Sequence, residues 1–220
     1  MASPTLPALS PRASKTRKAL IAAGFDLLVE RPIDAIPIDD LVAKAGVAKG
    51  SFFNHFKDKR EFGIAIGTEV RLELEALVAQ ANLGISDPVE RMVGGMCVSA
   101  KFALTQPKRS TVLLRSQATS TALGHPLNKG LRKDIEAACD LGLLRPESKS
   151  SGVLYWLGLC QILMVNLVEN IDKCEIHSNR LNEMLVLGLT GLGVSEKHAR
   201  EVASIGIETC FGKNEAILNI

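Results

Sequence analysis

Apolar residues recur at helical spacing along most of the chain, and no segment shows the convincing period-two alternation of a β-strand. Pro, Gly and Asn interrupt the apolar stripes and mark the connections between them. The pattern therefore predicts an all-α fold with nine or ten helices. Besides two short helices between residues 38 and 59, we expect helices over residues 15–29, 59–81, 88–105, 107–118, 126–140, 150–171, 180–192 and 196–210.

The segment 38–59, IDDLVAKAGVAKGSFFNHFKDK, has the pattern of two short helices joined by a tight turn. Gly46 can adopt the positive φ that a helix C-terminus favours, and Phe52 and Phe56 repeat at i, i+4 on the second helix. Two helices joined by such a turn form a helix-turn-helix, whose second helix enters the major groove of DNA. The structural alternative is a plain helical hairpin whose polar residues face water. The apolar face of the first helix consists of Ile38, Leu41 and Val42.

The remaining side chains of the second helix suit contact with DNA. Lys49 can reach guanine acceptors or a phosphate, Asn54 can read a base edge, and Ser51 can hydrogen-bond to either. Phe53 offers an apolar contact, for example to a thymine methyl group. Gly50 allows the backbone to approach the DNA closely.

The charge distribution suits a nucleic-acid contact at one end of the chain. The formal net charge is only +2, but residues 1–60 carry 10 Lys and Arg against 6 Asp and Glu. Residues 61–220 carry 16 against 18, so the basic excess lies in the N-terminal part. An ordinary solvated surface can produce an excess of this size, so the charge supports the helix-turn-helix prediction without establishing it.

The chain lacks the motifs of the common enzyme classes. It has no phosphate-cradling glycine motif, no nucleophile elbow and no HExxH, and its four histidines are scattered. Its five cysteines are widely spaced, without a CxxC pair, which argues against a disulfide framework or a zinc site. We therefore predict that the protein is not an enzyme and that it uses no metal or cofactor.

Pro4, Pro7 and Pro11 occupy the region where a secretory signal would have its apolar stretch, so no signal peptide is expected. Residues 1–14 are instead expected to form a flexible, partly polyproline-like tail. This composition and the unpaired cysteines predict a protein of the reducing cytoplasm.

An uncharged run in the C-terminal half, residues 150–168, is close to the length of a membrane span. Gln161 and Asn166 interrupt it, and its flanks show no marked basic asymmetry. A helix that is apolar on nearly all sides also fits between a domain core and a subunit interface. We therefore interpret this segment as a core helix at a dimer interface.

Thr16-Arg17-Lys18 and the segment AAGFDLLVERPIDAIPIDDLVAKAGVAKGSFFNHFKDKREF together resemble the DNA-binding domain of the TetR family of bacterial transcriptional regulators. The resemblance covers about residues 15–62, and beyond this point only layout and length are similar. It implies an all-α homodimer that binds a near-palindromic operator as a repressor and is released by a small molecule. It also implies a DNA-binding domain over residues 15–60 and an effector-binding and dimerisation domain over residues 61–220.

The resemblance assigns DNA contacts residue by residue. It adds His55 and Lys59 as phosphate contacts, and Thr16 and Arg17 as a contact at the start of the first helix. The complete set comprises Thr16, Arg17, Lys49, Gly50, Ser51, Phe53, Asn54, His55 and Lys59. The chain departs from the family pattern at Ala48 and Pro37, where Ser or Thr is usual, and at Phe53, where Tyr is usual. The lost hydroxyls put some phosphate contacts in doubt.

A pocket for an apolar or weakly polar effector is expected among the helices between residues 87 and 167. Its candidate lining residues are Met92, Met96, Phe102, Leu113, Gln117, Trp156, Met164 and Asn166, each of which can also be ordinary core. Homodimerisation is expected through residues 150–192, where Gly158, Gly188 and Gly191 would permit close approach of a second copy. The alternative function is a helical ligand-binding or adaptor protein that has lost specific DNA binding.

Overall fold

The computed structural model describes residues 11–116 and 125–212, and all regular elements in these ranges are helices. This confirms the predicted all-α class. The helices are α1 (Pro11–Glu30), α2 (Ile38–Ala45), α3 (Lys49–Phe53), α4 (Lys59–Ala81), α5 (Pro88–Thr105), α6 (Pro107–Arg115), α7 (Lys129–Asp140), α8 (Ser148–Glu169), α9 (Cys174–Gly191) and α10 (Glu196–Phe211). Two short 3-10 turns, η1 (Ile33–Ala35) and η2 (Pro126–Asn128), precede α2 and α7.

Helices with strong local start signals have the predicted bounds. The Asp58 carboxylate accepts a hydrogen bond from the Glu61 amide at 2.8 Å, which fixes the start of α4 at Lys59. Asp87 likewise accepts from the Val89 amide at 2.7 Å and opens α5. These caps satisfy backbone donors that have no partner inside the helix, so the sequence alone was sufficient to place both starts.

Other boundaries differ from the prediction. Helix α1 begins at Pro11, inside the segment predicted as a tail, and Pro suits a first helical position. Helix α3 ends at Phe53, so Phe56 follows the helix while remaining buried. Helix α9 begins at Cys174, six residues before the prediction, and His177 in its first turns is buried with Nε2 2.8 Å from the Asn170 carbonyl oxygen.

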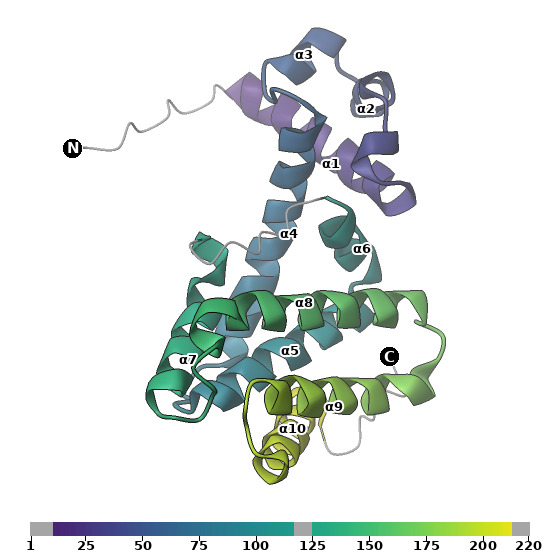
Figure 1. Cartoon of the computed structure of the whole chain (residues 1–220). Helices are drawn as coiled ribbons and strands as arrows, with labels where there is room; N and C mark the ends of the chain where they lie inside the picture. Colours follow the sequence, from purple (N-terminus) through teal and green to yellow (C-terminus); the bar gives the residue numbers. More distant parts are fainter. Residues whose placement is uncertain (1–10, 117–124, 213–220) are drawn as a thin grey trace, which may run out of the picture.

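The helices form two connected parts (Figure 1). Helices α1–α3 gather at one end of the molecule, and α4 runs from them into a body made by α5–α10. Within the body, α5 packs against α4, α7, α8 and α10, so it is the central helix of the core. Gly24 allows α1 to cross α4 closely, because a Cβ atom there would lie 2.4 Å from Cζ of Phe62.

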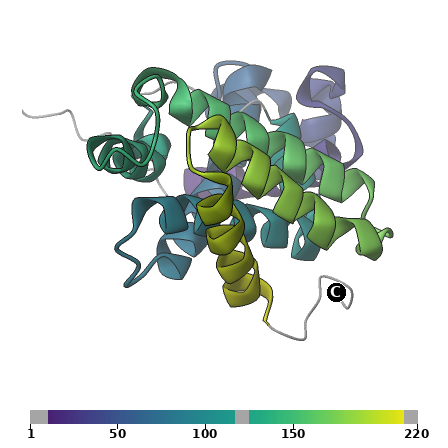
Figure 2. The ribbon, with the colours of Figure 1, turned by 60° about the horizontal axis from the view of Figure 1, so that its bottom comes forward.

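Helix α8 contains the uncharged run. It is the one helix in the described ranges that is long and apolar enough to cross a membrane, a property it shares with core helices of soluble proteins. It packs against α5, α6, α7 and α9, and 44% of its most apolar stretch is buried. Figure 2 shows α8 and α9 side by side on one face of the body.

Two of the three glycines predicted to admit a second copy instead serve the packing of α9 on α8. A Cβ atom at Gly188 would lie 2.9 Å from Cδ1 of Leu159, and one at Gly191 would lie 2.2 Å from the Tyr155 hydroxyl oxygen. The prediction for these two glycines is therefore corrected, because their close neighbours belong to the same chain. Gly158 has no neighbour within 4 Å and lies open on α8.

Candidate nucleic-acid interface and internal cavity

Helices α2 and α3 are joined by the turn that the sequence predicts. Gly46 has φ +65°, in the left-handed region, and its amide donates to the Ala43 carbonyl oxygen at 3.1 Å. The Val47 amide donates to the Val42 carbonyl oxygen at 3.0 Å. These bonds satisfy the last carbonyls of α2 and turn the chain directly into α3.

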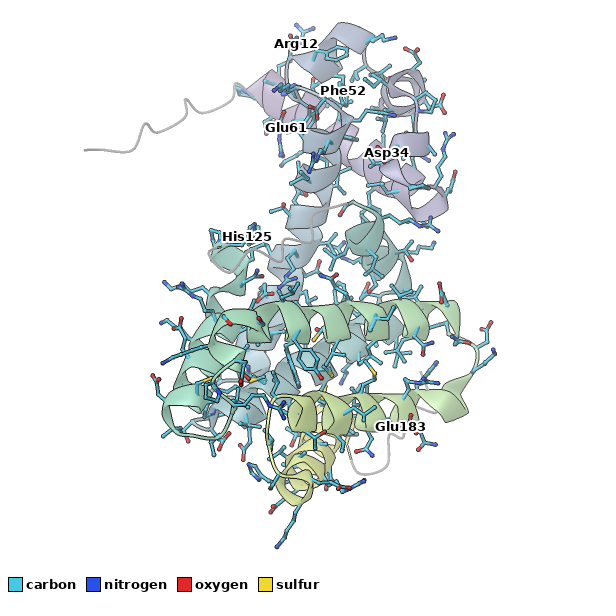
Figure 3. The ribbon with its side chains drawn as sticks, viewed as in Figure 1. Arg12, Asp34, Phe52, Glu61, His125 and Glu183 are labelled. Atoms are coloured by element: carbon cyan, nitrogen blue, oxygen red, sulfur yellow. The ribbon has the colours of Figure 1, made fainter. Side chains whose placement is uncertain are left out.

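An aromatic cluster holds α3 against the start of α4. The ring centroids of Phe52 and Phe62 lie 5.3 Å apart, and those of Phe56 and Phe62 lie 4.8 Å apart. All three rings are buried, and Figure 3 labels Phe52 near Glu61 at the start of α4. Because α3 is only five residues long, this cluster rather than its own backbone bonds fixes its orientation.

The opposite side of α3 faces solvent. Phe53, an aromatic ring that a folded core would normally cover, is 53% exposed. The other predicted contacts from this stretch are exposed (Lys49, Gly50 and Asn54) or half-buried (Ser51 and His55). Polar groups, a cation, an apolar ring and a glycine backbone thus share one accessible surface at the end of the molecule.

Lys49 is paired on this surface. Its Nζ lies 2.9 Å from Oδ1 of Asp39 on α2, and both side chains are more than half exposed. An exposed pair of this kind contributes little to stability and is weakened by salt. Lys49 therefore remains available to exchange Asp39 for a base or a phosphate.

Lys59 is bound to the protein itself. Its Nζ donates to the carbonyl oxygens of Asp34 at 2.9 Å and Ile36 at 3.1 Å, which fixes the η1 turn to the start of α4. An ammonium group has three N–H donors, so one remains for another partner. The structure thus gives Lys59 a structural role that the sequence did not predict.

The predicted contact at α1 lies against α4. Arg17 forms an ion pair with Glu69 at 3.5 Å, and its guanidinium carbon lies 5.5 Å from the centroid of the Phe56 ring. Thr16, the preceding residue, is half-buried. Arg17 therefore bridges α1, α4 and the aromatic cluster.

The departures from the family pattern have a local structural consequence. Ala48 and Pro37 occupy the N-cap positions of α3 and α2, and neither makes a side-chain capping bond. The amide donors at the start of each helix thus lack the hydroxyl that Ser or Thr would supply.

A partly open cavity of about 150 Å³ lies between α4, α5, α6, α7 and α8. It brings together four of the residues predicted from the sequence, namely Met92, Leu113, Trp156 and Met164. Phe102 instead lines a separate open groove between α4, α5 and α10, while Met96 and Asn166 line neither space. Gln117 lies outside the described residues.

The polar wall of this cavity was not predicted from the sequence. Its charged residues are Arg71 and Glu75 on α4, Arg91 on α5 and Asp134 on α7. Arg71 is buried beside Val70 and Leu74, on the apolar side of α4. The sequence signal for this wall is an arginine on an apolar stripe four residues before a glutamate, although such pairs usually lie on exposed faces.

Comparison with known proteins agrees with this architecture. Residues 20–66 match the family described as bacterial regulatory proteins, tetR family. A putative tetR family transcription regulator from Shewanella sp. PV-4 superimposes with a TM-score of 0.69 at 14% identity, covering 82% of this chain and 99% of that one. RolR in complex with resorcinol gives a TM-score of 0.59 at 19% identity, covering 88% and 95%. AibR in complex with isovaleryl coenzyme A and operator DNA gives a TM-score of 0.50 at 19% identity, covering 68% of this chain and 85% of that one.

A helix-turn-helix module carried on a helical body defines the class of DNA-binding regulators. Within this class, residues 20–66 match the DNA-binding part of the tetR family of bacterial regulatory proteins, and the whole chain shares the fold of solved tetR family regulators.

Proposed function

We propose that this protein is a cytoplasmic repressor that binds a near-palindromic operator as a homodimer and leaves it when a small molecule occupies the cavity. The observation that carries the proposal is the exposed face of α3, where Lys49, Phe53 and Asn54 are held outward by the buried aromatic cluster. This arrangement suits insertion into a major groove.

The proposed DNA contacts divide into two groups. Lys49, Gly50, Ser51, Phe53 and Asn54 would meet base edges and the neighbouring backbone. Thr16, Arg17, His55 and Lys59 would meet phosphates. For Lys59 the phosphate contact would use its remaining N–H donor, in addition to the carbonyl bonds described above.

One helix-turn-helix reads only a half-site, so dimerisation is needed for useful specificity. The face made by α8 and α9 supports this role, because Leu154 and Ile162 on α8 are 56% and 57% exposed and Leu187 on α9 is 65% exposed. Gly158 lies open between Leu154 and Ile162. Adjacent exposed apolar side chains of this kind mark interaction sites.

The proposed division into a DNA-binding unit and a regulatory unit falls within α4. Phe62 and Ile66 on α4 are fully buried against the N-terminal part, whereas Leu74 lines the cavity. Ligand bound at the C-terminal half of α4 therefore acts on the same rigid helix that carries α3. A ligand that favours one of two arrangements of this helix changes the spacing of the two α3 helices in the dimer.

The test is selection of bound sequences from random duplex DNA at two salt concentrations. An enriched inverted repeat is the expected result and supplies the operator probe. Retention that depends on salt and selects no sequence would contradict specific recognition. A repeat after refolding removes any bound ligand, and no selection in that repeat would favour the alternative, a helical ligand-binding or adaptor protein. The uncapped start of α3 at Ala48 is the observation in favour of that alternative.

A further inference from the structure

The cavity wall contains an ion pair within a single helix, in which the arginine is buried and the glutamate is half-buried. Nε of Arg71 donates to Oε1 of Glu75 at 2.7 Å, and Nη2 of Arg71 lies 2.5 Å from the same oxygen. The Arg71 side chain is only 10% exposed and that of Glu75 is 30% exposed. Both residues belong to α4, so the pair joins no two elements of the fold.

The second ion pair of the wall has a clear structural role. Nε of Arg91 on α5 donates to Asp134 on α7 at 2.7 Å, and Nη1 lies 3.5 Å from the carbonyl oxygens of Asn82 and Ile85. This pair therefore connects α5, α7 and the loop between α4 and α5. Burial raises the pKa of Asp134, and Arg91 opposes this effect.

The Arg71–Glu75 pair calls for a different explanation. Burying two charges costs desolvation energy that mutual attraction only partly returns, and apolar replacements of such pairs are often neutral or stabilising. Within the described residues, Nη1 of Arg71 and Oε2 of Glu75 have no hydrogen-bond partner. One donor of Arg71 and one acceptor of Glu75 thus remain on the wall of an otherwise mainly apolar cavity.

The size and charge of the cavity restrict its occupant. An apolar cavity of about 150 Å³ accommodates a benzene ring, and this cavity has the same volume. Its four charged residues form two ion pairs and leave the wall neutral. A charged ligand would leave one charge uncompensated in a low-dielectric site, which is strongly unfavourable.

Building on the proposed function, we propose that the effector is a neutral, single-ring molecule whose hydroxyl group binds the Arg71–Glu75 pair. The hydroxyl accepts from Nη1 of Arg71 and donates to Oε2 of Glu75. The ring lies against the apolar side chains of the opposite wall, including Leu113, Trp156 and Met164.

Ligand binding in the cavity can be measured through Trp156. It is the only tryptophan in the chain, it is 2% exposed, and it lines the cavity. Its fluorescence is therefore a binding signal that requires no DNA. We would titrate the full chain with phenol, toluene, benzoate and benzylammonium, which have similar size and differ in hydrogen bonding and charge.

The expected result is a saturable fluorescence change with phenol. The other three probes should bind at least ~10-fold more weakly, because losing a hydrogen bond or burying a charge costs at least ~1 kcal/mol. Toluene binding as tightly as phenol would overturn the role of the hydroxyl group. Benzoate or benzylammonium binding as tightly would overturn neutrality. Binding of 2-naphthol without any binding of phenol would overturn the size, and no binding of any probe would overturn the proposal as a whole.

A charge variant provides a gain-of-function test. Glu75→Gln removes the carboxylate and leaves Arg71 unpaired, so benzoate should bind at least ~10-fold more tightly than to the wild type. Glu201→Gln, on the exposed surface of α10, is the matched control and should leave the order of the probes unchanged. If Glu75→Gln melts early by circular dichroism, the wild-type series still decides the question.

These outcomes are separate from those of the proposed function. Phenol that binds while operator DNA stays bound would contradict release by ligand and leave the ligand class intact. Selection of an operator without binding of any neutral ring would contradict the ligand class and leave DNA recognition intact.

Discussion

Arg115, the last residue of α6, donates from Nη1 to the carbonyl oxygen of Val29 at 2.7 Å, in the last turn of α1. The same nitrogen lies 3.3 Å from the Leu28 carbonyl oxygen. Carbonyls in the last turn of a helix lack intrahelical partners, and a cation there also interacts favourably with the helix dipole. Leu113 and Leu114, just before Arg115, line the cavity. One short helix thus contacts both the cavity and the DNA-binding part.

Arg115→Ala should weaken the link between ligand and DNA. We expect a loss of stability of about 1–3 kcal/mol, the usual contribution of a hydrogen bond from a charged group. We also expect the ligand to cause a smaller fall in operator affinity than in the wild type. Operator titrations with and without ligand measure the coupling. Arg200→Ala, which removes an exposed pair within α10, is the control, and an equal effect of both variants would refute the specific role of Arg115.

Lys59→Ala should act on stability as well as on DNA. Loss of the ammonium leaves the Asp34 and Ile36 carbonyl oxygens without this donor, so we expect a loss of about 1–3 kcal/mol in a thermal or denaturant melt. Binding to cognate and scrambled DNA should fall by similar factors, since a phosphate contact carries no sequence information. An unchanged melt would show that the two carbonyl bonds are not important for stability.

Lys49→Ala should act on sequence preference alone. The exposed pair with Asp39 contributes at most about 1 kcal/mol, so the melting temperature should change little. The ratio of cognate to scrambled affinity should fall, with a loss of about 1–3 kcal/mol if Lys49 reads a guanine. Competition binding at fixed salt measures this ratio. Equal losses on both DNAs would assign Lys49 to a phosphate instead.

Ile162→Glu should disrupt the proposed dimer. Ile162 lies on the exposed apolar face of α8 and is 57% exposed, so a charge there costs little in the monomer and opposes burial against a second copy. Sedimentation at micromolar concentration should show a shift from dimer to monomer, accompanied by loss of operator binding. Ile205→Glu on α10, where the isoleucine is 51% exposed, is the matched control. A dimer that persists in Ile162→Glu would place the interface elsewhere.

The fold class, most helix starts and the helix-turn-helix could be predicted from the local sequence. These features depend on local physics, such as the Asp58 and Asp87 caps, the positive φ of Gly46 and the i, i+4 repeat of apolar residues. Each can be recognised within a few residues of sequence. The predicted start of α9 is six residues late, because the pattern gave no sign that His177 is buried with Nε2 2.8 Å from the Asn170 carbonyl oxygen at the end of α8.

The contacts between side chains of different helices depend on the packing of the whole fold and could not be predicted from the local sequence. The hydrogen bonds from Lys59 and Arg115 to backbone carbonyl oxygens join residues far apart in the sequence, so no local sequence pattern predicts them. Gly188 and Gly191 were misread for the same reason, because a small residue permits close approach without specifying which helix approaches. The Arg71–Glu75 pair is visible in the sequence as an i, i+4 spacing, but the burial of Arg71 follows from how α4 is rotated against α5 and α6. That rotation is set by packing of the whole core, which the local sequence does not specify.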